Sequence, residues 1–260
     1  MESKDFIPIL IKLLAQLNFA QLPAPSGFPT GGILQFFVLP DDAAGMNDYP
    51  QTKQSTFRVI YHKEVLSESD HMADFPEITW IAGHDGTDYA EELYPIKGEF
   101  ALTGELSSYF MPFSTHEFDG AFAAFCERQG IKSDFGPYFA EVPDDMTKDE
   151  YKEFDRRQRK LQDLIWREFS GDEAHRFGGW PYFIQHDPRD WDRGDPAWKK
   201  YDTLLLAITS EYNNDKSDIR VISDSDEIMW GDAGVANFLI NAEDLKNLDF
   251  SDIMYVWDSC

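Results

Sequence analysis

Two acidic stretches near the C-terminal end hold the residues whose types best suit chemistry. The first, HRFGGWPYFIQHDPRDWDRGD (residues 175–195), combines histidines and aspartates with tryptophans, and the second, SDSDEIMWGDAG (residues 223–234), holds four carboxylates. Carboxylate oxygens bind hard cations, and two carboxylates in opposed environments can divide acid and base roles. These stretches supply our candidate binding residues, which are Gln185, His186, Asp187, Asp190, Trp191, Asp192, Asp224, Asp226, Trp230 and Asp232.

An architectural interpretation of the first stretch is favoured over a phosphate-binding loop. Such a loop places its glycines between a strand and a helix, whereas Gly178 and Gly179 follow a predicted helix. We expect the two glycines to end that helix with positive φ. Pro181 and Pro188 should then hold the chain extended. Trp191 and Trp198, inside a charged loop, are expected to be exposed.

The second stretch also has a structural interpretation, and neither stretch has a metal-binding pattern. Asp232 and Gly234 are typical turn residues, with Trp230 expected to pack beneath the turn. The aspartates lack the glycine and terminal glutamate of a calcium loop, and no histidine has a partner at zinc-ligand spacing. Arg189 can instead neutralise neighbouring carboxylates as a surface ion pair. We therefore predict neither a metal nor any other cofactor.

No nucleophile constellation is visible in the sequence. The chain lacks a Gly-x-Ser-x-Gly motif, and neither cysteine has an obvious histidine partner. The remaining histidines are scattered along the chain, at His62, His71, His84 and His116. No catalytic residue is assigned, and this pattern favours a binding protein over an enzyme.

Composition limits the partners and the compartment. The 260 residues carry a formal net charge of −25, which repels nucleic-acid phosphates and suits a basic protein partner. Cys126 and Cys260 form no disulfide framework, and this agrees with a reducing compartment. The opening residues 1–23 match neither a signal peptide nor a membrane span. We therefore expect a cytoplasmic protein that contacts no membrane.

Strands and capped helices should position the candidate residues. The apolar, β-branched runs at 32–40, 56–62, 203–210, 235–241 and 253–258 predict strands, and the near-continuous apolarity of 32–40 and 203–210 predicts central ones. Capping-box spacing predicts helices over 114–130, from Ser114, and over 147–169, from Thr147. The basic run 156–160 is interpreted as a solvated face. A shorter helix over 242–248 follows an Asn241 cap.

A weak internal repeat indicates a duplicated architecture. LLAQLNF (residues 13–19) is followed by GILQFFV (32–38), and LLLAITS (204–210) by GVANFLI (234–240). Gly32, Gln35 and Phe36 then correspond to Gly234, Asn237 and Phe238. We predict a mainly β to α+β fold, internally duplicated, with several flanking helices. It forms one domain over 1–260, built from halves of about 1–110 and 170–260 around a helical middle.

The assembled motifs resemble the YwqG-like family, domain of unknown function 1963. The resemblance is carried by LLAQLNFAQLPAPSGFPTGGILQFFV (residues 13–38), FRVIYHKEV (57–65), HRFGGWPYFIQHDPR (175–189) and IMWGDAGVANFLINAEDLKNLDFSDIMYVWDSC (228–260). It implies a bacterial, internally duplicated mainly-β or α+β protein. In that family a glutamine usually occupies the position of Ala207, and Gln16 keeps this residue in the first repeat. The resemblance implies no established activity.

Two functional hypotheses follow. The first is a cytosolic protein-binding module, an interaction or immunity protein that neutralises a basic partner; the immunity role reflects the association of some relatives with secreted toxin systems. The Asp187–Asp192 and Asp224–Asp232 segments would form its contact surface. The alternative is a small-ligand- or metal-binding hydrolase with a cleft between the two repeats, where Gln185, His186, Asp187, Asp226 and Asp232 would converge.

Overall fold

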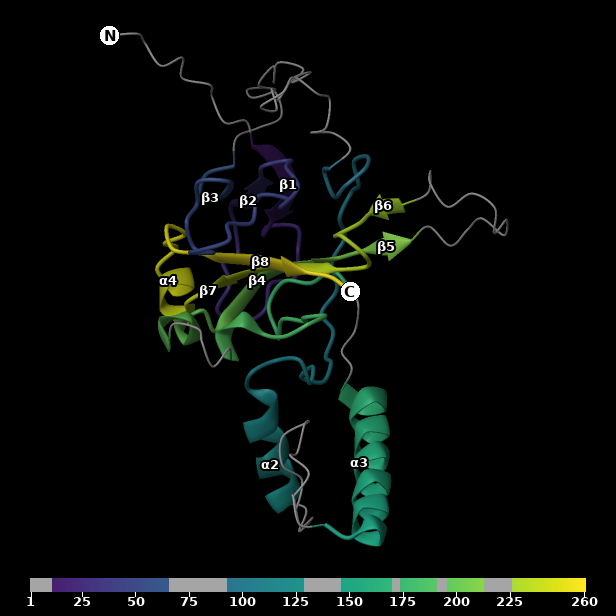
Figure 1. The fold of residues 1–260 in the computed structure, drawn as a ribbon. Helices are drawn as coiled ribbons and strands as arrows, with labels where there is room; N and C mark the ends of the chain where they lie inside the picture. The colour runs from purple at the N-terminus through teal and green to yellow at the C-terminus, as the bar shows by residue number, and fades with distance from the viewer. Residues whose placement is uncertain (1–10, 66–92, 129–145, 170–173, 191–195, 213–225) are drawn as a thin grey trace. The chain divides into compact units, whose positions relative to one another are not determined.

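A computed structural model describes residues 11–65, 93–128, 146–169, 174–190, 196–212 and 226–260 (Figure 1). The chain forms two compact units. The first comprises Met1–Ser107, His175–Gly179 and Lys200–Cys260, and the second comprises Ser108–Ala174 and Trp180–Lys199. Strands belong to the first unit and the two long helices to the second, which confirms the expected β-rich α+β class.

The first unit contains two three-stranded antiparallel sheets and one two-stranded ribbon. All five predicted strands are confirmed, and the segment 13–19 of the repeat supplies a sixth. The first sheet has the order β1 (Lys12–Asn18), β2 (Ile33–Val38), β3 (Phe57–His62). The second sheet has the order β4 (Thr203–Thr209), β7 (Val235–Ile240), β8 (Met254–Asp258). The ribbon is formed by β5 (Glu211–Tyr212) and β6 (Asp226–Ile228).

The two sheets are copies of one another, residue by residue. Gln16 lies opposite Gln35 in the first sheet, as Ala207 lies opposite Asn237 in the second. Each pair of strands carries a register shift at the same point, between Leu13 and Ala15 in β1 and between Leu204 and Leu206 in β4. The third strands also match, with Phe36 opposite Val59 and Phe238 opposite Tyr255. The predicted internal repeat is therefore confirmed.

One hydrophobic core fills the space between the facing sides of the two sheets. The equivalent residues Phe36 and Phe238 meet there edge to face, with ring centroids 4.9 Å apart. Phe57 adds contacts to Phe238 and to Tyr255, at 6.2 and 5.2 Å. Leu34 and most of the other inward residues of both sheets are almost fully buried, and Ala15, Tyr61 and Trp257 pack partly buried against them. Because each half contributes only one wall, the two repeats share a single core.

Each repeat covers an edge of the other. The segment after β2 lies along β8, where the Tyr255 N–H donates to the Gln51 carbonyl at 3.1 Å and Trp257 Nε1–H donates to the Ala43 carbonyl at 2.6 Å. In the other direction, Gln54 links the edge of β3 to the segment after β7. Its Oε1 accepts the Val59 N–H at 2.9 Å, and its Nε2 donates to the Phe250 carbonyl, also at 2.9 Å.

Residues 175–178 pair with the outer edge of β4. In this region the structure differs from three expectations. Arg176 and Ala207 exchange two main-chain hydrogen bonds, at 3.0 and 2.7 Å, so β4 is a covered edge strand rather than a central one. Gly178 has the expected positive φ of 73°, but the preceding helix ends at Phe169, so the glycine serves this edge contact instead. A Cβ at Gly178 would lie 2.8 Å from the Pro25 ring. Pro188 begins a 3-10 turn rather than extended chain.

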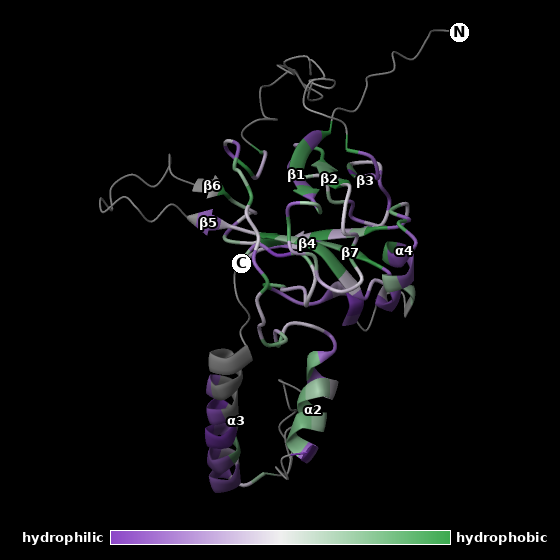
Figure 2. Cartoon of the chain, turned by 180° about the vertical axis from the view of Figure 1, so that it is seen from behind, coloured by the Kyte–Doolittle hydropathy of each residue, from purple (hydrophilic) through white to green (hydrophobic). Residues whose placement is uncertain are grey.

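The second unit contains α2 (Phe118–Arg128), α3 (Lys148–Phe169) and the 3-10 turn η1 (Pro188–Asp190), while η2 (Pro196–Lys200) ends at its boundary. Figure 2 shows α2 as largely hydrophobic and α3 as largely hydrophilic. The expected α3 capping box is present, since Thr147 N–H donates to Glu150 Oε2 at 2.9 Å. Its basic run is solvated as predicted, with Arg159 exposed and paired to Asp155 at 2.9 Å.

The beginning of α2 differs from the prediction. The helix starts at Phe118, because Ser114 Oγ accepts the Phe183 N–H at 3.2 Å instead of capping the helix. On α2, Cys126 is buried, whereas Phe125 is 41% exposed. In the first unit, α4 (Ala242–Lys246) has its predicted cap, with the Glu243 N–H donating to Asn241 Oδ1 at 3.0 Å. Among the helices of the described ranges, none combines the length and apolarity of a membrane span.

Candidate functional site

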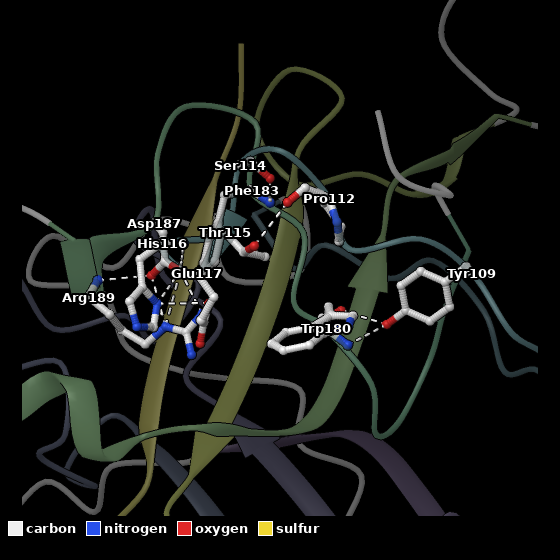
Figure 3. Close-up of polar contacts among 10 residues, drawn as sticks. All are labelled: Tyr109, Pro112, Ser114, Thr115, His116, Glu117, Trp180, Phe183, Asp187 and Arg189. Carbon is white, nitrogen blue, oxygen red and sulfur yellow. Dashed lines mark hydrogen bonds and ion pairs between the residues drawn. The ribbon is translucent and has the colours of Figure 1, made fainter. Parts of the chain in front are cut away.

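A buried cluster of charged side chains lies in the second unit, around Asp187 (Figure 3). Arg189 donates two hydrogen bonds to Asp187, from Nε to Oδ1 at 2.9 Å and from Nη2 to Oδ2 at 2.6 Å. His116 Nδ1 lies 3.3 Å from the same Oδ2 and 3.0 Å from Glu117 Oε2. The side chains of Asp187 and Arg189 are 1% and 0% exposed. The cluster is thus a network of two carboxylates, a guanidinium and an imidazole, in which Asp187 and Arg189 are buried and His116 and Glu117 are partly exposed.

Two loops are joined side by side to bring these groups together. The loop before α2 donates the His116 N–H to Asp187 Oδ2 at 3.0 Å. Further along, the Tyr109 hydroxyl donates to the Trp180 carbonyl at 2.7 Å, and Figure 3 draws Tyr109 beside that main chain. The 3-10 turn that starts at Pro188 turns Arg189 back onto Asp187, two residues earlier. The Ser114–Phe183 contact joins the same two loops and explains why α2 begins late.

Electrostatics keep the Asp187 carboxylate ionised. Burial alone would raise the pKa of Asp187, since the charged form loses water. Hydrogen bonds from His116 and Arg189, with the charge of Arg189, outweigh burial and lower the pKa to about 2. Buried ion pairs are tolerated when such hydrogen bonds satisfy the remaining lone pairs.

The cluster offers metal-ligand atoms but already contains a cation. One ligand atom each from His116, Glu117 and Asp187 lies within 4.8 Å of the others, a spacing that suits a divalent ion. Arg189 Nη2, however, lies 2.6 Å from Asp187 and 3.4 Å from Glu117. Its guanidinium pairs with both carboxylates where a metal would otherwise bind. Chemically, the arrangement is best suited to fixing the two loops.

Among the predicted site residues that the structure describes, Asp187 alone lies in this cluster. Its expected surface pairing with Arg189 is wrong, because both side chains are buried. In the same unit, Gln185, His186 and Asp190 are exposed beside it, whereas Trp198, expected to be exposed, is 7% exposed and therefore buried. The predicted residues Trp191, Asp192 and Asp224 lie outside the described residues.

The second predicted stretch belongs to the first unit and forms the expected turn. Trp230 is 1% exposed and packs against Trp257, with ring centroids 6.3 Å apart. The Gly234 N–H closes the turn on the Trp230 carbonyl at 2.8 Å, and Asp232 is exposed at its tip. Asp226 begins the short strand β6. This stretch is therefore structural at Trp230 and solvated at Asp232.

His116 and Glu117 were missed by sequence reasoning. They lie about seventy residues from Asp187 in the chain, with |i−j| of 71 between His116 and Asp187. Ser114 and Glu117 have capping-box spacing, and that local pattern hides the ionic role of Glu117. An adjacent His–Glu pair ahead of a helix was the one available signal, and it is weak.

An open sheet face in the first unit is the second candidate site. Alternation places nine residues of β1–β3 on the side away from the core. Across its centre runs a hydrogen-bonded polar row, in which His62 Nε2–H donates to Gln35 Oε1 at 2.9 Å and Gln35 Nε2 donates to Gln16 Oε1 at 2.7 Å. We define this outer face by Leu13, Gln16, Asn18, Ile33, Gln35, Phe37, Arg58, Ile60 and His62.

The fold and these sites define a duplicated, β-rich α+β protein with one salt-bridged loop cluster and one open sheet face. The chain belongs to the family described as Domain of unknown function (DUF1963), whose model matches residues 8–260. The family expected from the sequence motifs is confirmed at that level. No curated protein matches the chain.

Proposed function

We propose that this chain is a cytoplasmic protein-binding module that uses the outer face of β1–β3. The supporting observation is a difference between the two copies of the sheet. In the second sheet, eight of the nine residues equivalent to the outer face are buried, and only Asp258 is half-buried. In the first sheet the same positions include Leu13, 44% exposed, and Ile60, 37% exposed. A face that is buried in one copy and open in the other is suited to a partner.

The chemistry of the outer face suits a protein surface. Ile60 and Leu13 offer apolar area, and the polar row from Gln16 to His62 offers amide and imidazole hydrogen-bonding groups. None of its nine residues is acidic, although the chain carries a net charge of −25. The net negative charge of the chain would attract a basic partner at long range. The outer face, which has no acidic residue, would then hold the partner through buried apolar contacts.

A site-specific cross-link tests this proposal. A photoreactive p-benzoylphenylalanine at position 13 should capture one partner in the cells that make the protein, and mass spectrometry should locate the link. Glu243, 73% exposed on α4, provides the control position. Capture of the same proteins from both positions, or from neither, would count against the outer face. Association of an identified partner should also slow as salt rises. If that partner is a toxin, loss of its activity in the complex would support the immunity role.

A metal-binding hydrolase is the second candidate, and the group His116, Glu117 and Asp187 favours it. If the cluster binds a cation, Arg189 must yield its place. Equilibrium dialysis against Zn²⁺ should then show one ion bound per chain, and Arg189→Met should strengthen binding. Absence of binding in both proteins would exclude this candidate for the cluster.

A further inference from the structure

A groove of about 530 Å³ runs along the outer edge of β3 in the first unit, where β3 pairs with no further strand among the described residues. Its walls are β3 itself, through Arg58, Ile60 and Tyr61, and the chain after α4, through Leu248 and Phe250. Gln54 also lines it. Tyr61 and Phe250 pack together, with ring centroids 5.3 Å apart, and give the groove an aromatic wall.

The main chain of β3 presents hydrogen-bonding groups to this groove. Val59 donates its N–H to the Gln54 side chain rather than to β2, so Val59 points its peptide groups outward. In an antiparallel strand, the peptide groups of alternate residues point the same way. Phe57 and Tyr61 therefore point theirs outward as well. Such an edge is a template for an additional extended segment.

The second repeat already shows what the equivalent edge binds. Tyr255 of β8 corresponds to Val59, and its outward N–H donates to the main-chain carbonyl of Gln51 at 3.1 Å. The segment around Gln51 thus binds the edge of β8 through its main chain. On β3, the carboxamide of Gln54 accepts in place of such a carbonyl. A side-chain amide is chemically a copy of a peptide group, so an incoming peptide can replace it without losing a hydrogen bond.

Leu248 supports a binding role for the groove through its unusual backbone. It follows the last turn of α4 with φ of 58°, and the Asp249 N–H donates to the Asp244 carbonyl at 2.9 Å. This is the Schellman end of a helix, where glycine or asparagine normally occupies the position of Leu248. A leucine there is strained, and its side chain remains 38% exposed while lining the groove. Strain retained at an exposed apolar residue is typical of a ligand-contacting position.

We infer that this groove binds an extended peptide segment that carries a carboxylate, added as a fourth strand beside β3. Arg58 is the charged side chain among the residues that line the groove, and it supplies the complementarity for that carboxylate. Ile60, Leu248 and Phe250 supply apolar contacts for alternate side chains of the segment. The inference rests on the proposed function, because Arg58 and Ile60 belong to both the groove and the outer face. It requires one carboxylate in the bound segment of a partner whose overall charge is basic.

A phage-displayed library of random heptapeptides, selected on the full chain, tests the inference. Enriched peptides should combine an aspartate or glutamate with apolar residues at alternate positions. Synthetic copies, titrated by fluorescence anisotropy, should bind Arg58→Glu at least about tenfold more weakly than the unmodified chain. Lys97→Glu, an equal charge change at an exposed lysine outside the groove lining, should leave affinity unchanged.

Leu248→Gly provides a second variant, for which we expect higher stability of the fold but weaker binding of the peptide. Removal of the strained side chain should raise the midpoint of urea unfolding and weaken peptide binding about tenfold. A purely structural leucine would change stability without affecting binding. Enrichment of basic peptides, or affinities unchanged in both groove variants, would overturn the inference. If no heptapeptide is enriched while the cross-link from position 13 captures a partner, the groove inference fails and the proposed function stands.

Discussion

Asp187 and Arg189 form an ion pair in which both side chains are buried. Asp187→Asn would leave the Arg189 guanidinium buried beside a neutral amide. Loss of one partner from a buried pair costs about 3–5 kcal/mol, and we expect the free energy of unfolding in urea to fall by that amount. The exposed neighbour Asp190 is the matched control, since Asp190→Asn should change stability by less than about 0.5 kcal/mol. Equal effects of the two changes would contradict the cluster's role.

His175 links stability to pH near neutrality. Its Nδ1 accepts the Thr209 N–H at 3.1 Å, and burial lowers its pKa from the ordinary 6.5, although the charge of Glu211 opposes that shift. Because the folded pKa is lowered, the contribution is complete above pH 6.5 and is lost as pH falls through the lower folded value. Protonation at Nδ1 also removes the acceptor for Thr209.

His175→Asn should flatten this pH dependence, because an amide oxygen accepts the same hydrogen bond and does not titrate. The measurement is the free energy of urea unfolding from pH 7.5 to pH 5, compared with His186→Asn at an exposed histidine. If the His186 variant flattens the curve and the His175 variant does not, the assignment is wrong.

Secondary-structure elements show how far local sequence patterns reach. The capping patterns at Thr147 and Asn241 predicted the starts of α3 and α4, because their hydrogen bonds are made within four residues. The same type of pattern failed at Ser114, whose hydroxyl is used by Phe183, 69 residues away. Local rules hold where no distant partner competes for the capping group.

Asn241 permits a direct measurement of one cap. Asn241→Ala should lower the free energy of unfolding by about 1 kcal/mol, because the Glu243 N–H loses its acceptor. Asn241→Asp keeps that acceptor and should retain most of the stability, although it loses the bond from Asn241 Nδ2 to the Lys200 carbonyl. An equal loss in the two variants would show that the Lys200 contact, which both variants lack, dominates over the cap.

For the whole molecule, the repeat was predictable and the charged cluster was not. Gln35 and Asn237 are equivalent positions of the two repeats, as are Phe36 and Phe238. This equivalence is visible in short motifs, because both repeats keep the same alternation of residues along the strand. The contact of His116 with Asp187 depends on how two loops meet, and no periodicity in the sequence encodes it. The bounds of the two predicted halves stay a prediction.

A double-mutant cycle measures whether the repeats share one core. Phe36→Ala and Phe238→Ala should each cost about 3–5 kcal/mol, since both rings are fully buried. Because the two rings touch at 4.9 Å, the double variant should lose less than the sum, by about 1 kcal/mol or more. Strict additivity in urea unfolding would indicate two energetically separate halves.

The reciprocal covering of edges has an evolutionary consequence. The chain after β2 covers β8, and the chain after β7 reaches β3 through Gln54. In a half-length ancestor with the same strands, the segment after the second strand would cover the third strand of a second copy, as the chain around Gln51 covers β8. The present arrangement therefore has the connectivity of a fused homodimer.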